Sequence, residues 1–350
     1  MNKKKIFSIT IFLIIFCFLF STVQELLKPK WGEGTAGARE TLNANGFYAE
    51  PEDSLDVIFI GSSHCFFAVS PLKMWQEYGF TSYVRGSANQ SMFLSYYTLK
   101  DSLINQTPKA VVVEIGQVEE EFDLNEDEWI ARRGLDYLRM NKVKAEAIMD
   151  LDLEGTQQSP MDYFFPLFRY HSRWKELSKN DFDYYNWDHH NAYKGQYTGV
   201  SIYHHQWAEG FMEPTDEVFE LPERSVDYLD RIAQLCKEAG IPLVLFKSPM
   251  DEWTYAKYNS VQQLADKYEV PYIDYNLPEN IKAIGLNPAS DFHYNQWHLR
   301  VTGADKLSKH LGQYLQENYK LPDLRQNPAY EVWNEDLEKY IDLKKQYNLP

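Results

Sequence analysis

The apolar and polar positions of the chain alternate between short apolar runs and amphipathic stretches. Continuous apolar runs typical of buried strands cover residues 55–60, 82–86, 110–115, 241–246 and 270–275. Helical patterns cover residues 71–78, 89–105, 224–239, 259–268 and 301–318. Runs without polar alternation suit a sheet that is covered on both faces. The order of the segments therefore predicts an α/β fold with a doubly wound parallel sheet.

A Gly-Ser turn follows the first apolar run. Gly61, Ser62 and Ser63 lie between that strand and a helix-compatible stretch. Parallel α/β folds present reactive groups at the carboxyl edge of the sheet, so Ser63 is a candidate nucleophile. A simple turn with a helix-capping serine is the alternative. Gly86 and Gly116 end two further runs and are expected along the same edge.

The N-terminus predicts export. Lys3-Lys4-Lys5 precedes an almost unbroken apolar run from Ile6 to Phe20, which extends to Val23. No Ala-x-Ala-like cleavage site follows it, which favours an uncleaved signal anchor over residues 1–25, with the lysines inside. A cleaved signal peptide is the alternative. In both cases the remainder is expected outside the cytoplasm.

The composition along the chain predicts the domain boundaries and excludes some classes of function. Residues 26–51 are Gly-rich and predict a linker, 52–320 the globular domain with an insertion at about 119–222, and 321–350 a C-terminal tail. A net charge of -16 argues against nucleic-acid binding. The pairs His189-His190 and His204-His205 lack the spaced partners of a metal site and are interpreted as loop histidines. We expect neither metal nor cofactor, and Cys65 and Cys236 buried and unpaired.

A base for Ser63 would have to come from elsewhere in the chain. His298 lies just before the last helix, and this place in the order of the chain suits a base for Ser63. A histidine near a helix N-terminus is the structural alternative. His64 adjoins the serine, but consecutive side chains on an extended turn point in different directions, so it is a poor candidate.

These blocks resemble, in order, those of the SGNH/GDSL hydrolase superfamily, and more closely a Firmicutes group of membrane-anchored SGNH-like proteins. The resemblance spans about residues 52–320 and is carried by Gly61-Ser-Ser63, Gly86, Tyr170-His-Ser-Arg-Trp174, Lys247-Ser-Pro249 with Trp253, Asn295-Gln-Trp-His298 and His298-Leu-x-x-x-Gly303-Ala304. It implies a flavodoxin-like three-layer α/β/α fold and ester hydrolysis or acyl transfer. Ser63 would attack the acyl carbonyl, His298 would take its proton, and the Ser63 and Gly86 amides would hold the oxyanion.

Two positions depart from the family pattern. The aspartate three residues before the histidine is Asn295 here, which can orient the imidazole but cannot stabilise the imidazolium by charge. Asp291, if the loop folds back, or a backbone carbonyl could take the orienting role instead. The asparagine of the third block is also absent, and Asn89 or Gln117 could donate to the oxyanion in its place.

The resemblance also implies a setting. Anchored relatives, such as alginate acetylation proteins and the teichoic acid D-alanylation protein, work beside a membrane-bound O-acyltransferase. We therefore expect an extracytoplasmic serine acyltransferase or esterase for O-acyl, chiefly O-acetyl, groups of a cell-envelope polysaccharide or teichoic acid. Trp253 and Trp297 are expected to stack on the sugar. The alternative is a non-catalytic SGNH-like protein that binds glycan or assists such an acyltransferase.

Overall fold

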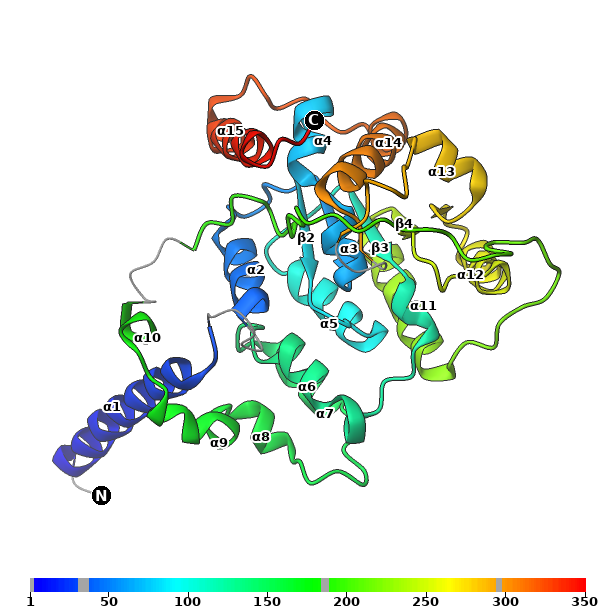
Figure 1. Cartoon of the computed structure of the whole chain (residues 1–350). Coiled ribbons are helices and arrows are strands. Elements are labelled where there is room, and N and C mark those ends of the chain that lie inside the picture. Colours follow the sequence, from blue (N-terminus) through cyan, green and yellow to red (C-terminus); the bar gives the residue numbers. More distant parts are fainter. Residues whose placement is uncertain (1–2, 31–37, 184–188, 294–297) are drawn as a thin grey trace.

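Five parallel strands form one sheet in the order β2-β1-β3-β4-β5 (Figure 1). The computed structural model describes residues 3–30, 38–183, 189–293 and 298–350. The strands are β1 (Val57–Gly61), β2 (Ser82–Gly86), β3 (Ala110–Glu114), β4 (Leu243–Lys247) and β5 (Tyr272–Asp274). This is the doubly wound order of flavodoxin-like folds, whose ligands bind at the switch point between β1 and β3. The predicted α/β class with a parallel sheet is confirmed.

Both faces of the sheet are buried, which explains the continuous apolar runs. In β1, Ile58 and Ile60 belong to one core, while Val57 and Phe59 belong to the core on the opposite face. The first core is completed by α5 (Met92–Ser102) and α11 (Glu223–Ala239), and the second by α3 (Ser63–Ala68) and α14 (Val301–Tyr319). Three further helices border them: α4 (Pro71–Tyr78), α12 (Tyr255–Tyr268) and α13 (Pro278–Ile284).

Helix starts follow their capping residues. The predicted bounds of α4 and β2 are confirmed to the residue. Helix α5 begins at Met92 rather than near Asn89 because the Ser91 side chain accepts the N–H of Leu94 at 3.4 Å. Asn89 itself adopts a left-handed turn conformation with φ of +53°.

Part of the expected linker is folded onto the domain. Residues 38–49 form α2 (Ala38–Ala49), which packs beside the edge strand β2. Asn43 Nδ2 donates to the Val84 carbonyl at 2.8 Å, and the Tyr83 hydroxyl donates to the Asn43 carbonyl at 2.8 Å. Phe47 is buried, at 1% exposure, and supplies the apolar contact that a linker would lack. The edge of β2 is therefore covered by a helix.

The insertion expected at about 119–222 has two parts. The first is helical and comprises α6 (Leu124–Leu135), α7 (Lys142–Met149), α8 (Pro160–Phe164), α9 (Leu167–Tyr170) and α10 (Lys179–Asp183), with 3-10 turns η1 (Gly116–Glu119) and η2 (His171–Lys175). The second, from residue 189, crosses the carboxyl edge of the sheet. There the Tyr197 N–H donates to the Phe66 carbonyl at 2.8 Å, and the Tyr203 N–H donates to the Phe292 carbonyl at 3.0 Å.

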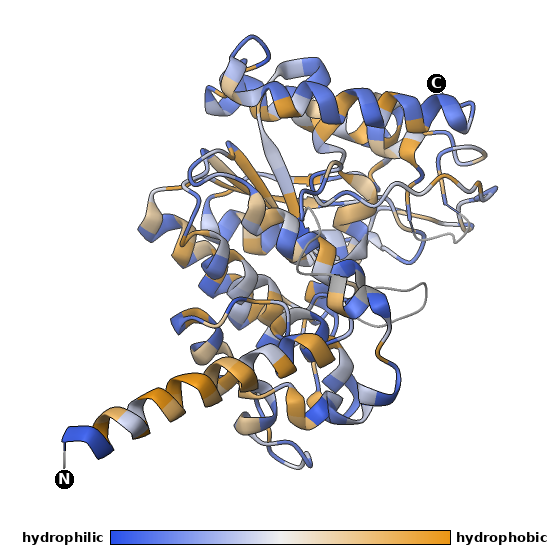
Figure 2. Ribbon diagram, turned by 90° about the vertical axis from the view of Figure 1, so that its left-hand side faces the viewer, coloured by the Kyte–Doolittle hydropathy of each residue, from blue (hydrophilic) through white to orange (hydrophobic). Residues whose placement is uncertain are grey.

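The two ends of the chain lie on opposite sides of the domain (Figure 1). The C-terminal tail forms the 3-10 turn η4 (Pro328–Tyr330) and α15 (Glu331–Gln346), and Trp333 packs on Trp75 of α4 with ring centroids 5.3 Å apart. At the other end, α1 (Lys3–Leu27) projects from the domain with its apolar side chains exposed (Figure 2). It is long and apolar enough to cross a membrane, a property that N-terminal signal sequences share. Cys65 and Cys236 are buried and free, as expected.

Candidate active site

Ser63 is the first residue of α3, directly after the turn that ends β1. Ser62 caps this helix, and its hydroxyl accepts the N–H of His64 at 3.4 Å. The turn is tight, because a Cβ at Gly61 would lie 2.8 Å from the Cβ atoms of both Cys65 and Glu114. The turn therefore places Ser63 at the carboxyl end of β1, beside the β1/β3 switch point.

The expected oxyanion donors lie along the same edge. Gly86 is paired with Gly61 in the sheet, and a Cβ there would come within 2.2 Å of the Gly61 carbonyl oxygen. Only glycine fits at that position without moving the Ser63 turn. Asn89 is exposed in the turn after β2, and Gln117 is half-buried in η1 after β3. Ser63, Gly86, Asn89 and Gln117 thus lie at or just after the ends of neighbouring strands.

The fold brings His298 against the helix that Ser63 begins. The His298 ring stacks on Phe67 of α3, with centroids 4.4 Å apart and planes 27° apart. It also lies 5.0 Å from the ring of His64, the residue after Ser63. An antiparallel bridge between Phe292 and Leu299, with the His293 N–H donating to the His298 carbonyl at 2.8 Å, closes the loop that presents the imidazole. Residues far apart in sequence therefore meet at this edge.

The surroundings of His298 favour the neutral imidazole. Burial, reinforced by the nearby groups His64, His293, Arg39 and Lys247, lowers the pKa of His298 to about 3. A neutral ring can accept a proton. Each pKa unit corresponds to about 1.4 kcal/mol, so the imidazolium is costly unless a negative charge forms beside it. A negative charge that forms beside the ring would therefore favour its protonation.

Asp291 does not hold the imidazole in this structure. Its buried carboxylate accepts from Lys306 Nζ at 2.7 Å, from the Asn287 N–H at 2.7 Å and from Ser290 Oγ at 3.4 Å. These bonds fix the loop to α14 and leave the orienting role considered for Asp291 without a contact to His298. Asn295 lies outside the described residues.

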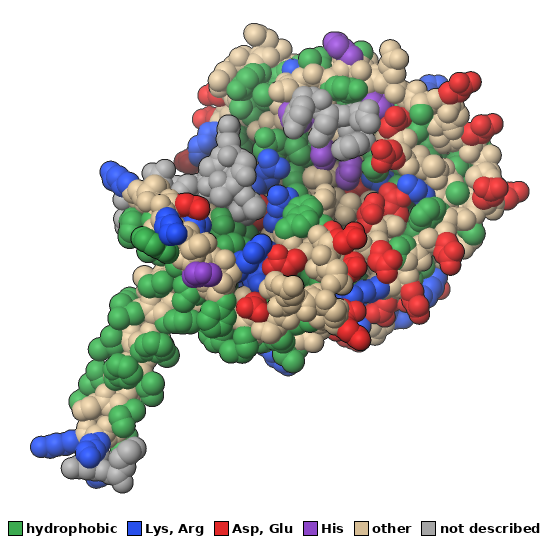
Figure 3. Space-filling model, turned by 60° about the horizontal axis from the view of Figure 1, so that its bottom comes forward, with side chains coloured by type: hydrophobic (Ala, Val, Ile, Leu, Met, Phe, Trp, Pro, Cys, Tyr) green, Lys and Arg blue, Asp and Glu red, His purple; other side chains and the backbone are tan. Residues whose placement is uncertain are grey.

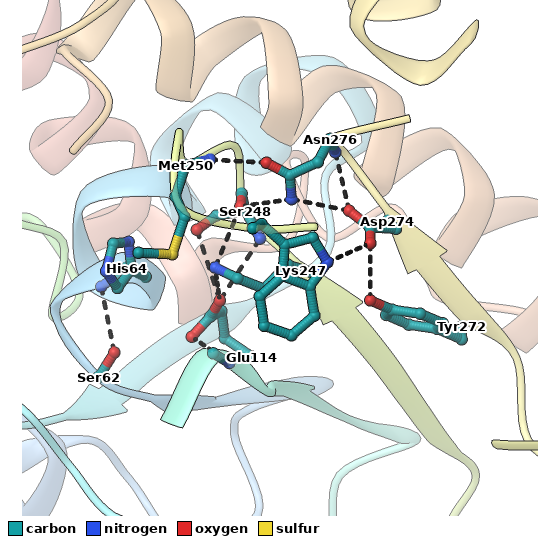
Figure 4. A network of polar contacts seen from close by, with 11 residues as sticks. Ser62, His64, Glu114, Lys247, Ser248, Met250, Tyr272, Asp274 and Asn276 are labelled. Atoms are coloured by element: carbon teal, nitrogen blue, oxygen red, sulfur yellow. Dashed lines mark hydrogen bonds and ion pairs between the residues drawn. The ribbon is translucent and has the colours of Figure 1, made fainter. Parts of the chain in front are cut away.

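A buried ion pair lies under the Ser63 turn (Figure 4). Lys247 Nζ, at the end of β4, donates to Glu114 Oε1 at 3.0 Å, and both side chains are fully buried. Glu114 Oε2 accepts the Gly116 N–H at 3.2 Å, and Glu114 Oε1 lies 3.4 Å from the Ser248 N–H. The pair links the end of β3 to the end of β4. Lys247 also lies close enough to His298 to contribute to the lowering of its pKa.

Trp253 packs in the core and offers no ring face to a sugar. It is 1% exposed, its Nε1 donates to Asp274 Oδ2 at 2.7 Å, and Lys247 Nζ lies 5.2 Å from its ring centroid. The expectation of sugar stacking at this residue conflicts with that burial. Trp297, the second residue expected to stack, lies outside the described residues.

Sequence reasoning missed Arg39 and the Glu114–Lys247 pair as parts of the site. Arg39 comes from the expected linker and lies with its guanidinium carbon 4.0 Å from the Tyr197 ring centroid. No local pattern links it to the site, because α2 reaches the edge only through tertiary packing. The ion pair did leave a signal, since opposite charges end two otherwise apolar runs.

The paired histidines serve as packing and hydrogen-bonding groups. His190 Nε2 lies 2.6 Å from Asp336 Oδ2, and His204 Nδ1 lies 2.8 Å from the Ala289 carbonyl oxygen. His205 packs against Trp207 with ring centroids 4.5 Å apart. Among the residues that the structure describes, no three His, Cys, Asp or Glu side chains are grouped to hold a metal.

Comparison with known proteins places the chain among distant structural neighbours. No protein-family profile and no curated protein matches the sequence. A GDSL-like lipase from Bacteroides thetaiotaomicron aligns with a TM-score of 0.39 and 14% identity over 80% of this chain and 98% of its own. A protein described as an acylhydrolase from Bacteroides fragilis aligns with a TM-score of 0.36 and 11% identity, over 83% and 100%. At these scores the roles of residues rest on the geometry of this chain alone.

Proposed function

We propose that the protein is a serine-dependent esterase or acyltransferase that acts on O-acyl groups. The observation that carries the proposal is that His298 packs against the short helix that Ser63 begins, beside the switch point of the sheet. There the His298 ring lies 4.4 Å from Phe67 and 5.0 Å from His64. A serine at the carboxyl end of β1, with an imidazole against the same short helix, brings together the two groups that nucleophilic acyl transfer uses.

In the proposed reaction, Ser63 Oγ attacks the acyl carbonyl while His298 accepts the hydroxyl proton. The backbone N–H groups of Ser63 and Gly86, with Asn89 or Gln117, would stabilise the oxyanion. That anion would stabilise a protonated His298. His298 then returns the proton to the leaving alcohol, and water or an acceptor hydroxyl releases the acyl group from Ser63 by the reverse steps.

The proposed setting is the outer face of the cell membrane. Helix α1 would anchor the chain, with Lys3-Lys4-Lys5 inside and the domain outside. The proposed substrate is an O-acetylated cell-envelope polysaccharide or teichoic acid, handled beside a membrane-bound O-acyltransferase. Arg39 supports an anionic substrate, because it places an exposed positive charge near His298 in a chain whose net charge is -16.

A second candidate function is a non-catalytic binding domain. It is favoured by the carboxylate of Asp291, which is bound to Lys306 at 2.7 Å rather than to His298. Because Asp291 is held by Lys306, it is not placed to stabilise an imidazolium, which suits glycan binding or an accessory role beside an acyltransferase.

Intact-mass measurement on the full chain in detergent separates the two functions. The protein is exposed to a fluorophosphonate and, separately, to p-nitrophenyl acetate. A catalytic serine predicts one phosphonyl or acetyl adduct that Ser63→Ala abolishes and that Ser62→Ala, which removes the adjacent hydroxyl, retains. His298→Ala should slow the labelling at least tenfold, because the neutral imidazole accepts the proton.

Absence of any adduct on wild-type protein with a native circular dichroism spectrum would replace catalysis with the binding function. An adduct that survives Ser63→Ala would place the nucleophile elsewhere. If the adduct is confirmed, release of the acetyl group to added polysaccharide rather than to water identifies a transferase.

A further inference from the structure

Residues 160–182 pack against the end of α1 that enters the domain. Phe165 meets Phe20 of α1 edge to face, with ring centroids 5.5 Å apart. Arg173 Nη1 donates to the carbonyl groups of Leu27 at 3.1 Å and Lys28 at 3.0 Å, where the last helical carbonyls lack intrahelical partners. Arg173 is itself held by Asp181 at 2.6 Å. The segment therefore packs around the C-terminal end of α1, which is called the root of α1 below (Figure 1).

The same segment carries large apolar side chains that the domain does not bury. Met161, Phe168, Trp174 and Phe182 are 52%, 52%, 64% and 57% exposed. Hydrophobic side chains gather where α1 joins the domain (Figure 3). Lys175 lies beside them, with Nζ 5.6 Å from the Trp174 ring centroid. Exposed aromatic and basic side chains in short helices are typical of a surface that lies in a membrane interface.

A cavity of about 390 Å³ opens beside this segment at the root of α1. Its lining includes Lys28, Arg139 and Lys144, with Phe164 and Phe165 at the apolar side. Among the described lining residues the acidic one is Glu25, and it is already paired with Lys28 at 2.8 Å. The cavity is thus basic in a chain whose net charge is -16.

Lys144 is the side chain that most needs a ligand in this cavity. It is 3% exposed, and its Nζ donates to the Leu138 carbonyl at 3.2 Å. Among the described residues no carboxylate oxygen lies within ion-pair distance of this ammonium. Burial, with the nearby charge of Lys28, lowers the pKa of Lys144 to about 8. A buried ammonium with one neutral acceptor is stabilised by an anion.

The position of the cavity identifies the anion. Helix α1 has 25 residues, so it is about 37 Å long, against roughly 30 Å for the hydrocarbon core of a bilayer. The last turn of an anchored α1 therefore emerges at the level of the lipid phosphates. The cavity and the exposed apolar side chains of 160–182 both lie at that turn.

We propose that residues 160–182 and the cavity at the root of α1 form a membrane seat, in which the apolar side chains enter the interface and Lys28, Arg139 and Lys144 bind the phosphate of an anionic phospholipid. The proposal rests on α1 acting as the proposed anchor, and it is independent of the chemistry of Ser63. A seated domain would hold its active edge at a fixed height and orientation above the membrane.

The first test measures depth in the bilayer with the full chain. Ser172→Cys, an exposed position two residues from Trp174, is labelled with an environment-sensitive fluorophore in a Cys17→Ser background and reconstituted into nanodiscs containing phosphatidylglycerol. Asp342→Cys, with a 73% exposed side chain on α15, is the matched control at the far end of the domain. Lipids with a quencher near the head group should quench position 172 at least threefold more than position 342. Equal quenching would overturn the seat.

The second test measures lipid selectivity by native mass spectrometry of the detergent-solubilised chain. Wild type should retain phosphatidylglycerol over phosphatidylcholine, and Lys144→Met should lower that preference about tenfold, as loss of one charge-assisted contact implies. Lys142→Met, on the same helix with a 90% exposed side chain, should leave it unchanged. Lys144→Arg keeps the charge and should keep the preference.

Two outcomes would overturn the lipid site. One is an equal loss in Lys144→Met and Lys142→Met. The other is displacement of the lipid by millimolar inorganic phosphate, which would identify a site for free phosphate. Fluorophosphonate labelling of Ser63 in the same variants keeps the two proposals apart. If Ser63 is labelled but the wild-type protein shows no preference for phosphatidylglycerol, the membrane seat alone is refuted. If wild-type protein prefers phosphatidylglycerol but Ser63 is not labelled, the catalytic proposal alone is refuted.

Discussion

Removing the ammonium of the Glu114–Lys247 pair tests how much this pair stabilises the carboxyl edge of the sheet, where the candidate active site lies. In Lys247→Met the buried Glu114 carboxylate loses its partner at 3.0 Å and keeps only neutral donors, namely the Gly116 N–H at 3.2 Å and the Ser248 N–H and Oγ at 3.4 and 3.5 Å. Breaking a fully buried pair in this way costs about 3–5 kcal/mol. Total stabilities of domains are about 5–15 kcal/mol, so the loss is large.

The double variant Lys247→Met/Glu114→Gln separates the charge from the packing. It removes both charges at similar volume, so we expect most of the lost stability to return, to within about 2 kcal/mol of wild type. Urea unfolding of the full chain in detergent, followed by far-ultraviolet circular dichroism, gives the three free energies of unfolding. The spectral region avoids Trp253, whose fluorescence would respond to the substitution directly.

Two results would refute this reasoning. A loss below about 1 kcal/mol in Lys247→Met would mean that water or a shifted donor replaces the ammonium. A double variant no more stable than the single one would mean that the packing of the two side chains, rather than their charges, stabilises the edge.

Two further predictions concern the imidazole and the C-terminal helix. Because the pKa of His298 is lowered to about 3, the fluorophosphonate labelling rate of Ser63 should stay flat from pH 8 to pH 5, and a midpoint near pH 6.5 would contradict the buried imidazole. The same shift makes the unfolded chain bind a proton that the folded chain does not, so the free energy of unfolding should fall as pH drops from about 6.5 towards 3. Trp333→Ala removes a 2% exposed ring from Trp75 and should cost about 3–5 kcal/mol, with hydrogen exchange rising in α15; exchange that stays at the wild-type level would show that α15 is held without it.

The comparison of α2 and α4 shows what local sequence can and cannot predict. The predicted bounds of α4 are confirmed, and local residues explain them: Ser70 caps the helix, Pro71 begins it and Gly79 ends it with φ of +80°. Helix α2 was interpreted as linker because its sequence is polar and Gly-rich nearby. Its stability comes from Phe47 and Asn43 packing on β2, which are contacts that no local pattern records.

The sheet and the serine turn follow from local sequence alone. Continuous apolar runs bury both faces of parallel strands, and Gly61 and Gly86 are required where a Cβ would meet a neighbouring strand. The partners of that turn depend on the three-dimensional fold. It placed His298 on Phe67, bound Asp291 to Lys306 and buried Trp253, because these contacts join residues from distant parts of the chain. Side-chain hydrogen bonds and burial depend on which surfaces meet, and that is settled by packing rather than by local pattern.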